Sequence, residues 1–104
     1  MNLKIETLST HAGYEPKETQ YGPMNIPITL ATAFHFGDAK TAAARFALQE
    51  LGPIYSRLTN PTLDAFEARV AALENGLAAI SASSGMAATF YAVANLVNAG
   101  DNII

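Results

Sequence analysis

The stretch that decides the fold is YSRLTNPT, residues 55–62. Its Asn60-Pro61 pair predicts the start of a helix, because an Asn side chain caps free backbone N–H groups and Pro fits the first helical position. The residue before a proline favours an extended conformation, so we expect the residues leading up to Asn60 to be non-helical. In an extended segment residues two apart share a side, which would point Tyr55 and Arg57 the same way.

Tyr55 and Arg57 together suit an oxyanion. Arg57 offers a planar fork of N–H donors, and the Tyr55 hydroxyl adds one more. The alternative is an ordinary surface Arg beside a half-buried Tyr, which is the commoner arrangement in loops. Taken alone, the pair favours this ordinary arrangement, and a second anion signal about thirty residues further on shifts the interpretation toward an oxyanion site.

The residues after Asn60 predict an alternation of helix and strand. Apolar side chains at 63, 66, 70 and 73 predict a helix that faces a core, with the charges at 64, 67, 69 and 74 forming a solvated face. Asn75-Gly76 would end this helix, with Gly76 in the left-handed conformation. Residues 77–82 are short and apolar, which favours a buried strand, although periodicity alone also allows a helix. A second helix is predicted over 86–98.

Residues 102–104 are typical of the start of another strand. Strand, helix and strand in this order predict the opening of a βαβ unit. Three residues cannot supply a partner strand, so we expect the chain to be the N-terminal piece of a longer protein. Upstream, residues 14–22 predict a polar arm and 28–36 an extended segment. A helix should begin after the N-cap Asp38 and close at Gly52-Pro53.

The turn Ser83-Ser84-Gly85 is the second anion signal. A helix N-terminus presents unpaired N–H groups and partial positive charge, and a glycine there lets the backbone approach a ligand closely. The alternative is an ordinary turn in which Ser is only the N-cap. No G-x-x-x-x-G-K-[ST] or G-x-G-x-x-G pattern is present, so a phosphate on a small organic cofactor is favoured over a nucleotide.

The composition limits the classes of function. Half of the 104 residues are hydrophobic and 14% are charged, which predicts burial against a partner or a larger body. A net charge of −3 without a basic run gives no reason to expect nucleic acid. The absence of cysteine excludes disulfides, thiolate metal sites and a cysteine nucleophile. Two isolated histidines predict no metal site, no apolar run predicts a membrane span, and the default compartment is the cytoplasm.

Five short motifs occur in a characteristic order: THAG at 10–13, YSR followed by NPT at 55–62, LENG at 73–76, SSGM at 83–86 and GD at 100–101. With this order and spacing the chain resembles the N-terminal part of the Cys/Met-metabolism enzymes that use pyridoxal phosphate (PLP). The resemblance covers essentially the whole chain, and Asn75 departs from it where glycine is usual. Residues 46–55 look most like the O-acetylhomoserine sulfhydrylase branch.

The resemblance implies an α/β fold, the N-terminal part of a fold type I PLP-dependent transferase. Residues 1–59 would form an extended arm and helix that contact a neighbouring subunit, and 60–104 would begin the mostly parallel-sheet cofactor domain. Tyr55 and Arg57 would reach across a dimer interface to the PLP phosphate, which Ser84, Gly85 and Met86 of the other subunit also hold. Tyr55 would in addition be catalytic, assisting proton transfer at the cofactor.

The implied activity is the PLP-dependent conversion of O-acetylhomoserine and sulfide to homocysteine and acetate, in methionine biosynthesis. The implied assembly is a dimer of dimers that shares its active sites. Cystathionine γ-synthase and methionine γ-lyase are alternatives in the same family. A non-catalytic interaction module is the alternative of another class. The Schiff-base lysine of the family has no match here, so we expect these 104 residues alone to be inactive.

Overall fold

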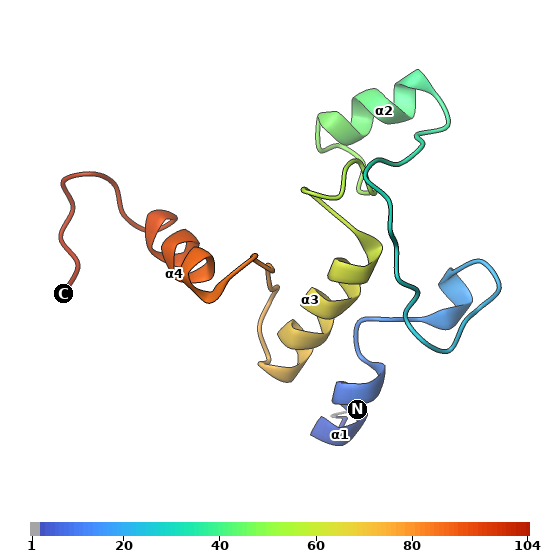
Figure 1. Ribbon diagram of the computed structural model, residues 1–104, viewed down its shortest axis with the longest axis horizontal. Coiled ribbons are helices and arrows are strands. Elements are labelled where there is room, and N and C mark those ends of the chain that lie inside the picture. Colours follow the sequence, from blue (N-terminus) through green and yellow to red (C-terminus); the bar gives the residue numbers. More distant parts are fainter. Residues whose placement is uncertain (1–2) are drawn as a thin grey trace.

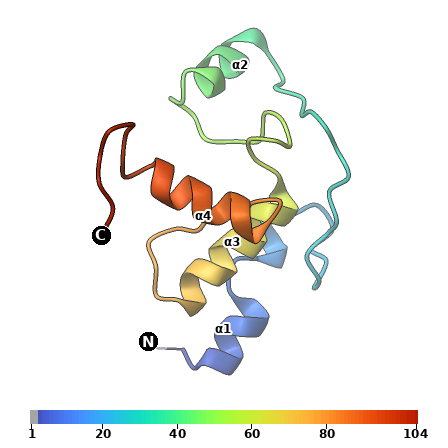
Figure 2. The same cartoon turned by 60° about the vertical axis from the view of Figure 1, so that its left-hand side comes forward.

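The computed structural model describes residues 3–104 (Figure 1). Its helices are α1 (Ile5–His11), the short 3₁₀ helix η1 (Pro16–Glu18), α2 (Ala39–Phe46), α3 (Pro61–Leu73) and α4 (Gly85–Ala94). In the two views α2 and α1 lie at opposite ends, with α3 between them (Figures 1 and 2). No helix within these residues is long and apolar enough to cross a membrane.

Helix α3 begins where the sequence predicts. The Asn60 side chain accepts a hydrogen bond from Thr62 N at 3.0 Å, and Pro61 takes the first helical position. The end of the helix differs in one detail, because the left-handed residue is Asn75, with φ 53°, and not Gly76. Gly76 N instead donates to Ala71 O at 2.8 Å, which closes a Schellman-type turn. Asn tolerates this conformation better than most residues.

The N-cap prediction for α2 is also confirmed. Asp38 accepts from Thr41 N at 2.7 Å, and this backbone hydrogen bond lowers the pKa of the Asp38 carboxyl. The prediction that this helix closes only at Gly52-Pro53 is wrong, since α2 ends at Phe46. Leu48 has a φ of 56°, a left-handed residue that the helix cannot include.

Helices α1 and α3 form the one packed helix pair in the described part of the chain. Gly13, with φ +80°, lies against the backbone of α3, where a β-carbon would meet Ala65 O and come within 2.9 Å of Arg69 N. Arg69 Nε donates to Ala12 O at 2.8 Å, so the side chain of α3 satisfies a carbonyl just beyond the end of α1. The predicted solvated face of α3 is therefore wrong at Arg69.

Residues 54–56, just before α3, pair with residues 32–34. Ala33 and Tyr55 form an antiparallel bridge, flanked by Phe34 N to Ile54 O at 3.2 Å and Ser56 N to Thr32 O at 2.9 Å. Residues 55–59 are non-helical as predicted, but after Tyr55 they form a tight turn. Leu58 N and Thr59 N both donate to Tyr55 O, at 2.8 and 3.0 Å. The extended conformation expected before Pro61 is found at Asn60, with φ −148° and ψ 128°, whereas the residues between Tyr55 and Asn60 turn instead of extending.

Two strand predictions are also wrong for the described residues. Neither 77–82 nor 102–104 has a sheet partner there, and a strand exists only when its backbone is paired. Helix α4 starts one residue earlier and ends four residues earlier than the predicted 86–98. Beyond it the chain runs away from α3 (Figure 1).

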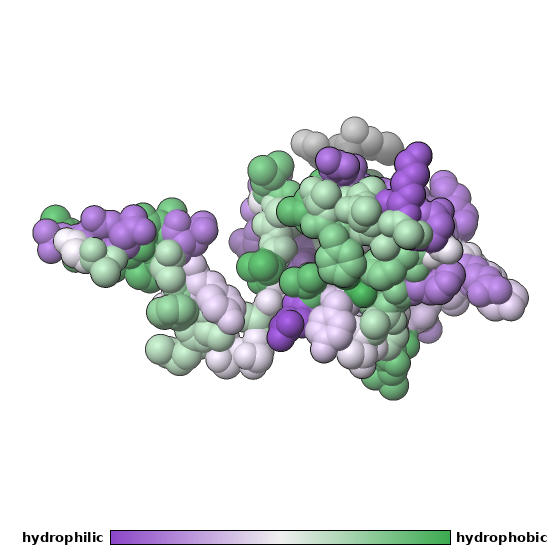
Figure 3. Space-filling model, turned by 90° about the horizontal axis from the view of Figure 1, so that it is seen from above, coloured by the Kyte–Doolittle hydropathy of each residue, from purple (hydrophilic) through white to green (hydrophobic). Residues whose placement is uncertain are grey.

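Residues 3–104 bury very little. Ala65 and Ala71 are the buried hydrophobic residues, and the predicted core-facing stripe of α3 is not buried: Leu63 and Phe66 are exposed, and Val70 and Leu73 are half-buried. The radius of gyration is 16.8 Å, against about 13 Å for a compact domain of this size. Figure 3 shows hydrophobic areas over the main body and along the projecting C-terminal part. So much exposed apolar surface requires further protein to cover it.

The close approach at Gly13 leads to a stability prediction. Gly13→Ala should lower the unfolding free energy of the full-length protein by at least about 1–3 kcal/mol. The backbone conformation is unfavourable for alanine, and the new β-carbon would collide with α3. Gly37→Ala is the matched control, since Gly37 has a similar φ of +86° but no atom near the added β-carbon. Thermal unfolding checks both variants. Equal losses would mean that the contact with α3 contributes nothing.

Candidate functional site

Tyr55 and Arg57 lie together, as predicted, although a turn rather than an extended strand brings them there. Arg57 Cζ is 5.5 Å from the centroid of the Tyr55 ring, within the range of a cation–π interaction. Arg57 is exposed and makes no ion pair among the described residues. Its guanidinium N–H donors are therefore available to a ligand or to another chain.

The turn before α4 has the form expected of an anion site. Ser84 caps the helix by accepting from Ala87 N at 3.1 Å, which leaves the N–H groups of Gly85 and Met86 in the unpaired first turn. A β-carbon built on Gly85 would meet nothing within 4 Å, and Gly85 has an ordinary φ. The described chain itself therefore does not require glycine here, and unpaired N–H groups at a helix N-terminus are a general means of binding an anion.

A cleft of about 390 Å³ connects the two regions within one chain. It is lined by residues 56–60, the first turns of α3, Tyr91, and residues 80–83 that lead into Ser84. Arg57 and Ser83 both line it. Within a single chain, Arg57 and the residues that lead into Ser84 thus border the same cleft.

Glu67 fixes one wall of this cleft. Its Oε1 accepts from both Ser81 N and Ser81 Oγ, each at 2.6 Å. Hydrogen bonds to a carboxylate are stronger than neutral ones, so α3 holds the segment that enters the anion turn. The sequence interpretation placed Glu67 on a solvated face and missed this role. The signal was weak, because one acidic residue in a helix gives no indication of its partner.

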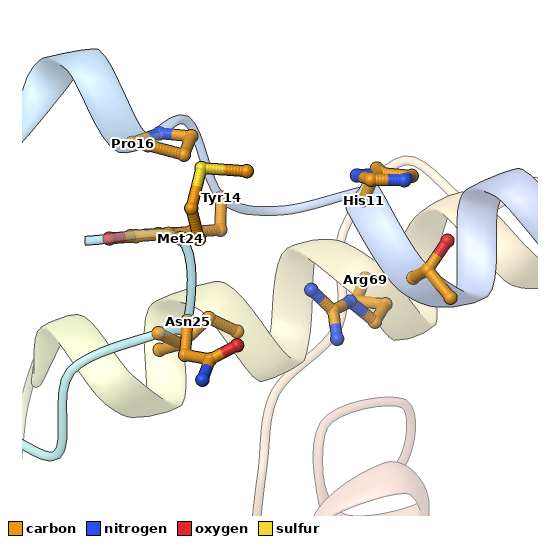
Figure 4. A pocket seen from close by; sticks show the side chains of 8 residues that line it. His11, Tyr14, Pro16, Met24, Asn25 and Arg69 are labelled. Carbon is orange, nitrogen blue, oxygen red and sulfur yellow. The ribbon is translucent and has the colours of Figure 1, made fainter. Parts of the chain in front are cut away.

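A second cleft, of about 340 Å³, lies between the end of α1, the arm and α3 (Figure 4). Arg69 extends from α3 into the space between His11 and Asn25, while Tyr14, Pro16 and Met24 line the other side (Figure 4). Tyr14 Oη donates to Pro23 O at 2.6 Å, which closes the polar arm on itself. No group of metal-binding side chains occurs among residues 3–104.

The family model for Cys/Met metabolism PLP-dependent enzymes matches residues 6–104. An O-acetyl-L-homoserine sulfhydrylase of Corynebacterium glutamicum is 52% identical over 96% of this chain and 23% of its own length. An L-methionine γ-lyase of Treponema denticola is 45% identical over 98% of this chain and 25% of its own. The chain therefore spans about a quarter of the length of the curated relatives that it matches.

The solved structures include a similar chain from Campylobacter jejuni, described as a putative O-acetylhomoserine (thiol)-lyase. It has a TM-score of 0.91 and 47% identity, over 96% of this chain and 24% of that one. That structure carries N′-pyridoxyl-lysine-5′-monophosphate. The likeness confirms the predicted fold class, the N-terminal part of a fold type I PLP-dependent enzyme.

The chain belongs to the Cys/Met metabolism PLP-dependent enzyme family. This is a family of PLP-dependent enzymes, as the sequence predicted. The residues present here fit one end of PLP, its phosphate, through the open donors at Gly85 and the free guanidinium of Arg57.

Proposed function

We propose that the full-length protein replaces the acetoxy group of O-acetylhomoserine with sulfide. The Cγ–O bond breaks and acetate leaves, while a C–S bond forms and gives homocysteine. The support is the similarity to sulfhydrylases, among them the Corynebacterium protein and an O-acetyl-L-homoserine sulfhydrylase of Thermus thermophilus that is 49% identical over 98% of this chain. The methionine γ-lyase match is only slightly more distant and keeps that activity as the second candidate.

The residues of this chain would grip the cofactor phosphate from two sides. Ser84, Gly85 and Met86 present the first turn of α4, and Tyr55 and Arg57 of a neighbouring protomer would supply a hydroxyl and a charged fork. The observation that carries this assignment is the exposed Arg57, which has no carboxylate partner among the described residues and is held over Tyr55. A dianion between a guanidinium and a helix N-terminus is strongly stabilised.

When bound, PLP supplies an electron sink for the bond changes at the amino-acid substrate. The residues of this chain would bind and orient it. The Tyr55 side chain is exposed, so its hydroxyl would be accessible to hold or move a proton beside the cofactor. We therefore retain the prediction that Tyr55 is catalytic.

The assembly is also part of the proposal. A dimer of dimers would complete each site and would cover the apolar side chains that residues 3–104 expose, such as Met24, Ile28 and Leu30 on the arm. The proposal also includes the division into an arm at 1–59, which would contact a neighbouring subunit, and a cofactor domain that begins at residue 60. A cytoplasmic location stays a prediction.

A substrate panel tests the activity. The purified full-length protein with PLP should form homocysteine from O-acetylhomoserine and sulfide faster than it forms cystathionine from O-acetylhomoserine and cysteine, or 2-oxobutyrate from methionine. Predominant release of 2-oxobutyrate would contradict the proposal and indicate a methionine γ-lyase. A colourless protein that turns over none of these would favour an interaction module.

The role of Arg57 has a direct test. Arg57→Lys keeps the charge but loses the planar fork, so PLP should bind roughly tenfold more weakly. Dialysis followed by absorbance measurement of the retained cofactor reports this loss. Lys17→Arg, a cation exchange at a side chain that is 79% exposed, is the control and should retain PLP as the native protein does. Unchanged retention in Arg57→Lys would show that the assignment is wrong.

A further inference from the structure

Asn60 is the buried polar residue of the described chain, with 8% of its surface exposed. Its side chain makes three hydrogen bonds. Oδ1 accepts from Thr62 N at 3.0 Å, while Nδ2 donates to Thr29 O at 3.1 Å and to Ser56 Oγ at 3.0 Å. One side chain thus joins the arm, the turn at 55–59 and the start of α3.

Capping α3 explains only one of these bonds. An N-cap needs an accepting oxygen, and Asp serves about as well as Asn. The two Nδ2 bonds are additional. A carboxylate could not donate to Thr29 O, and it could bond to Ser56 Oγ only if that hydroxyl gave up its bond to Ala31 O. An amide side chain at position 60 is therefore explained by the two hydrogen bonds of its nitrogen, and not by the capping of α3.

The amide nitrogen holds the residue between Tyr55 and Arg57. Ser56 is fixed from several directions, because its Oγ also donates to Ala31 O and its N–H donates to Thr32 O at 2.9 Å. Asn60 adds the contact that ties this serine back to α3. The backbone on both sides of Ser56 consequently has little freedom, although the side chains of Tyr55 and Arg57 are exposed.

We propose that Asn60 is a positioning residue that holds the Ser56 backbone so that Arg57, over the Tyr55 ring, is aimed at the cofactor phosphate. The inference rests on the proposed phosphate role of Arg57. A long cation on a fixed backbone loses less conformational freedom on binding than one on a mobile loop. Losing Asn60 should therefore weaken the grip on phosphate without removing any group that touches it.

The test uses the full-length apoenzyme and two ligands, PLP and pyridoxal, which lacks the phosphate. Asn60→Asp keeps the cap and the shape but loses both donors, and Ser56→Ala removes the acceptor without adding a charge. We expect each variant to bind PLP about three- to tenfold more weakly, the size of one or two lost hydrogen bonds, and to bind pyridoxal as the native protein does. In an Arg57→Ala background the further loss from Ser56→Ala should nearly disappear.

Asp38→Asn is the matched control, because Asp38 caps α2 through its oxygen alone. It should leave both affinities unchanged. Equal losses of PLP and pyridoxal affinity, or a full additional loss in the Arg57→Ala background, would overturn the proposal and leave Asn60 with a purely structural role. If Asn60→Asp does not fold, the Ser56→Ala result decides by the same criteria. Should Arg57→Ala itself leave PLP affinity unchanged, the phosphate role of Arg57 fails, and the Asn60 proposal fails with it.

Discussion

The side chain of Asn60 is the interaction on which the described structure depends. Three segments meet there: the residues around Thr29, the turn that carries Arg57, and helix α3. A buried amide with its donors satisfied favours one arrangement, because any other would leave polar groups unpaired away from water. Helix α3 extends that order further along the chain, through Glu67 to Ser81 and through Arg69 to Ala12.

Polar contacts define this structure because apolar burial hardly contributes. Two alanines are buried, whereas Leu77, Ile80 and Leu96 are each more than 80% exposed. The hydrophobic effect is the main favourable term in folding, so surface of this kind needs a covering body. The family membership, with a chain that spans about a quarter of its relatives, agrees with that requirement. Under the proposed function, parts of a larger subunit and a neighbouring protomer would cover it.

Local signals in the sequence predicted local structure well. The caps Asp38, Asn60 and Ser84 each accept the expected backbone hydrogen bond, because an N-cap depends on residues two or three positions away. Predicted strands that needed a distant partner did not form in the described residues, because 77–82 has no neighbouring strand there. The hydrogen bonds from Asn60 to Thr29 and from Ser81 to Glu67 could likewise not be predicted, because the neighbouring residues in the sequence give no information about a partner that is distant along the chain. The motif order identified the family, although the roles of Tyr55, Arg57 and Gly85 stay predictions.

The central claim is that one phosphate is held by Arg57 of one protomer and the Gly85 turn of another. Mixed oligomers of Arg57→Ala and Gly85→Val subunits test it most directly. If the site is shared, each mixed dimer contains one site with both changes and one with neither, so cofactor binding should return in up to half of its sites. If both elements act within the same chain, every site carries one change. Mixing would then restore nothing, and this result would contradict the account.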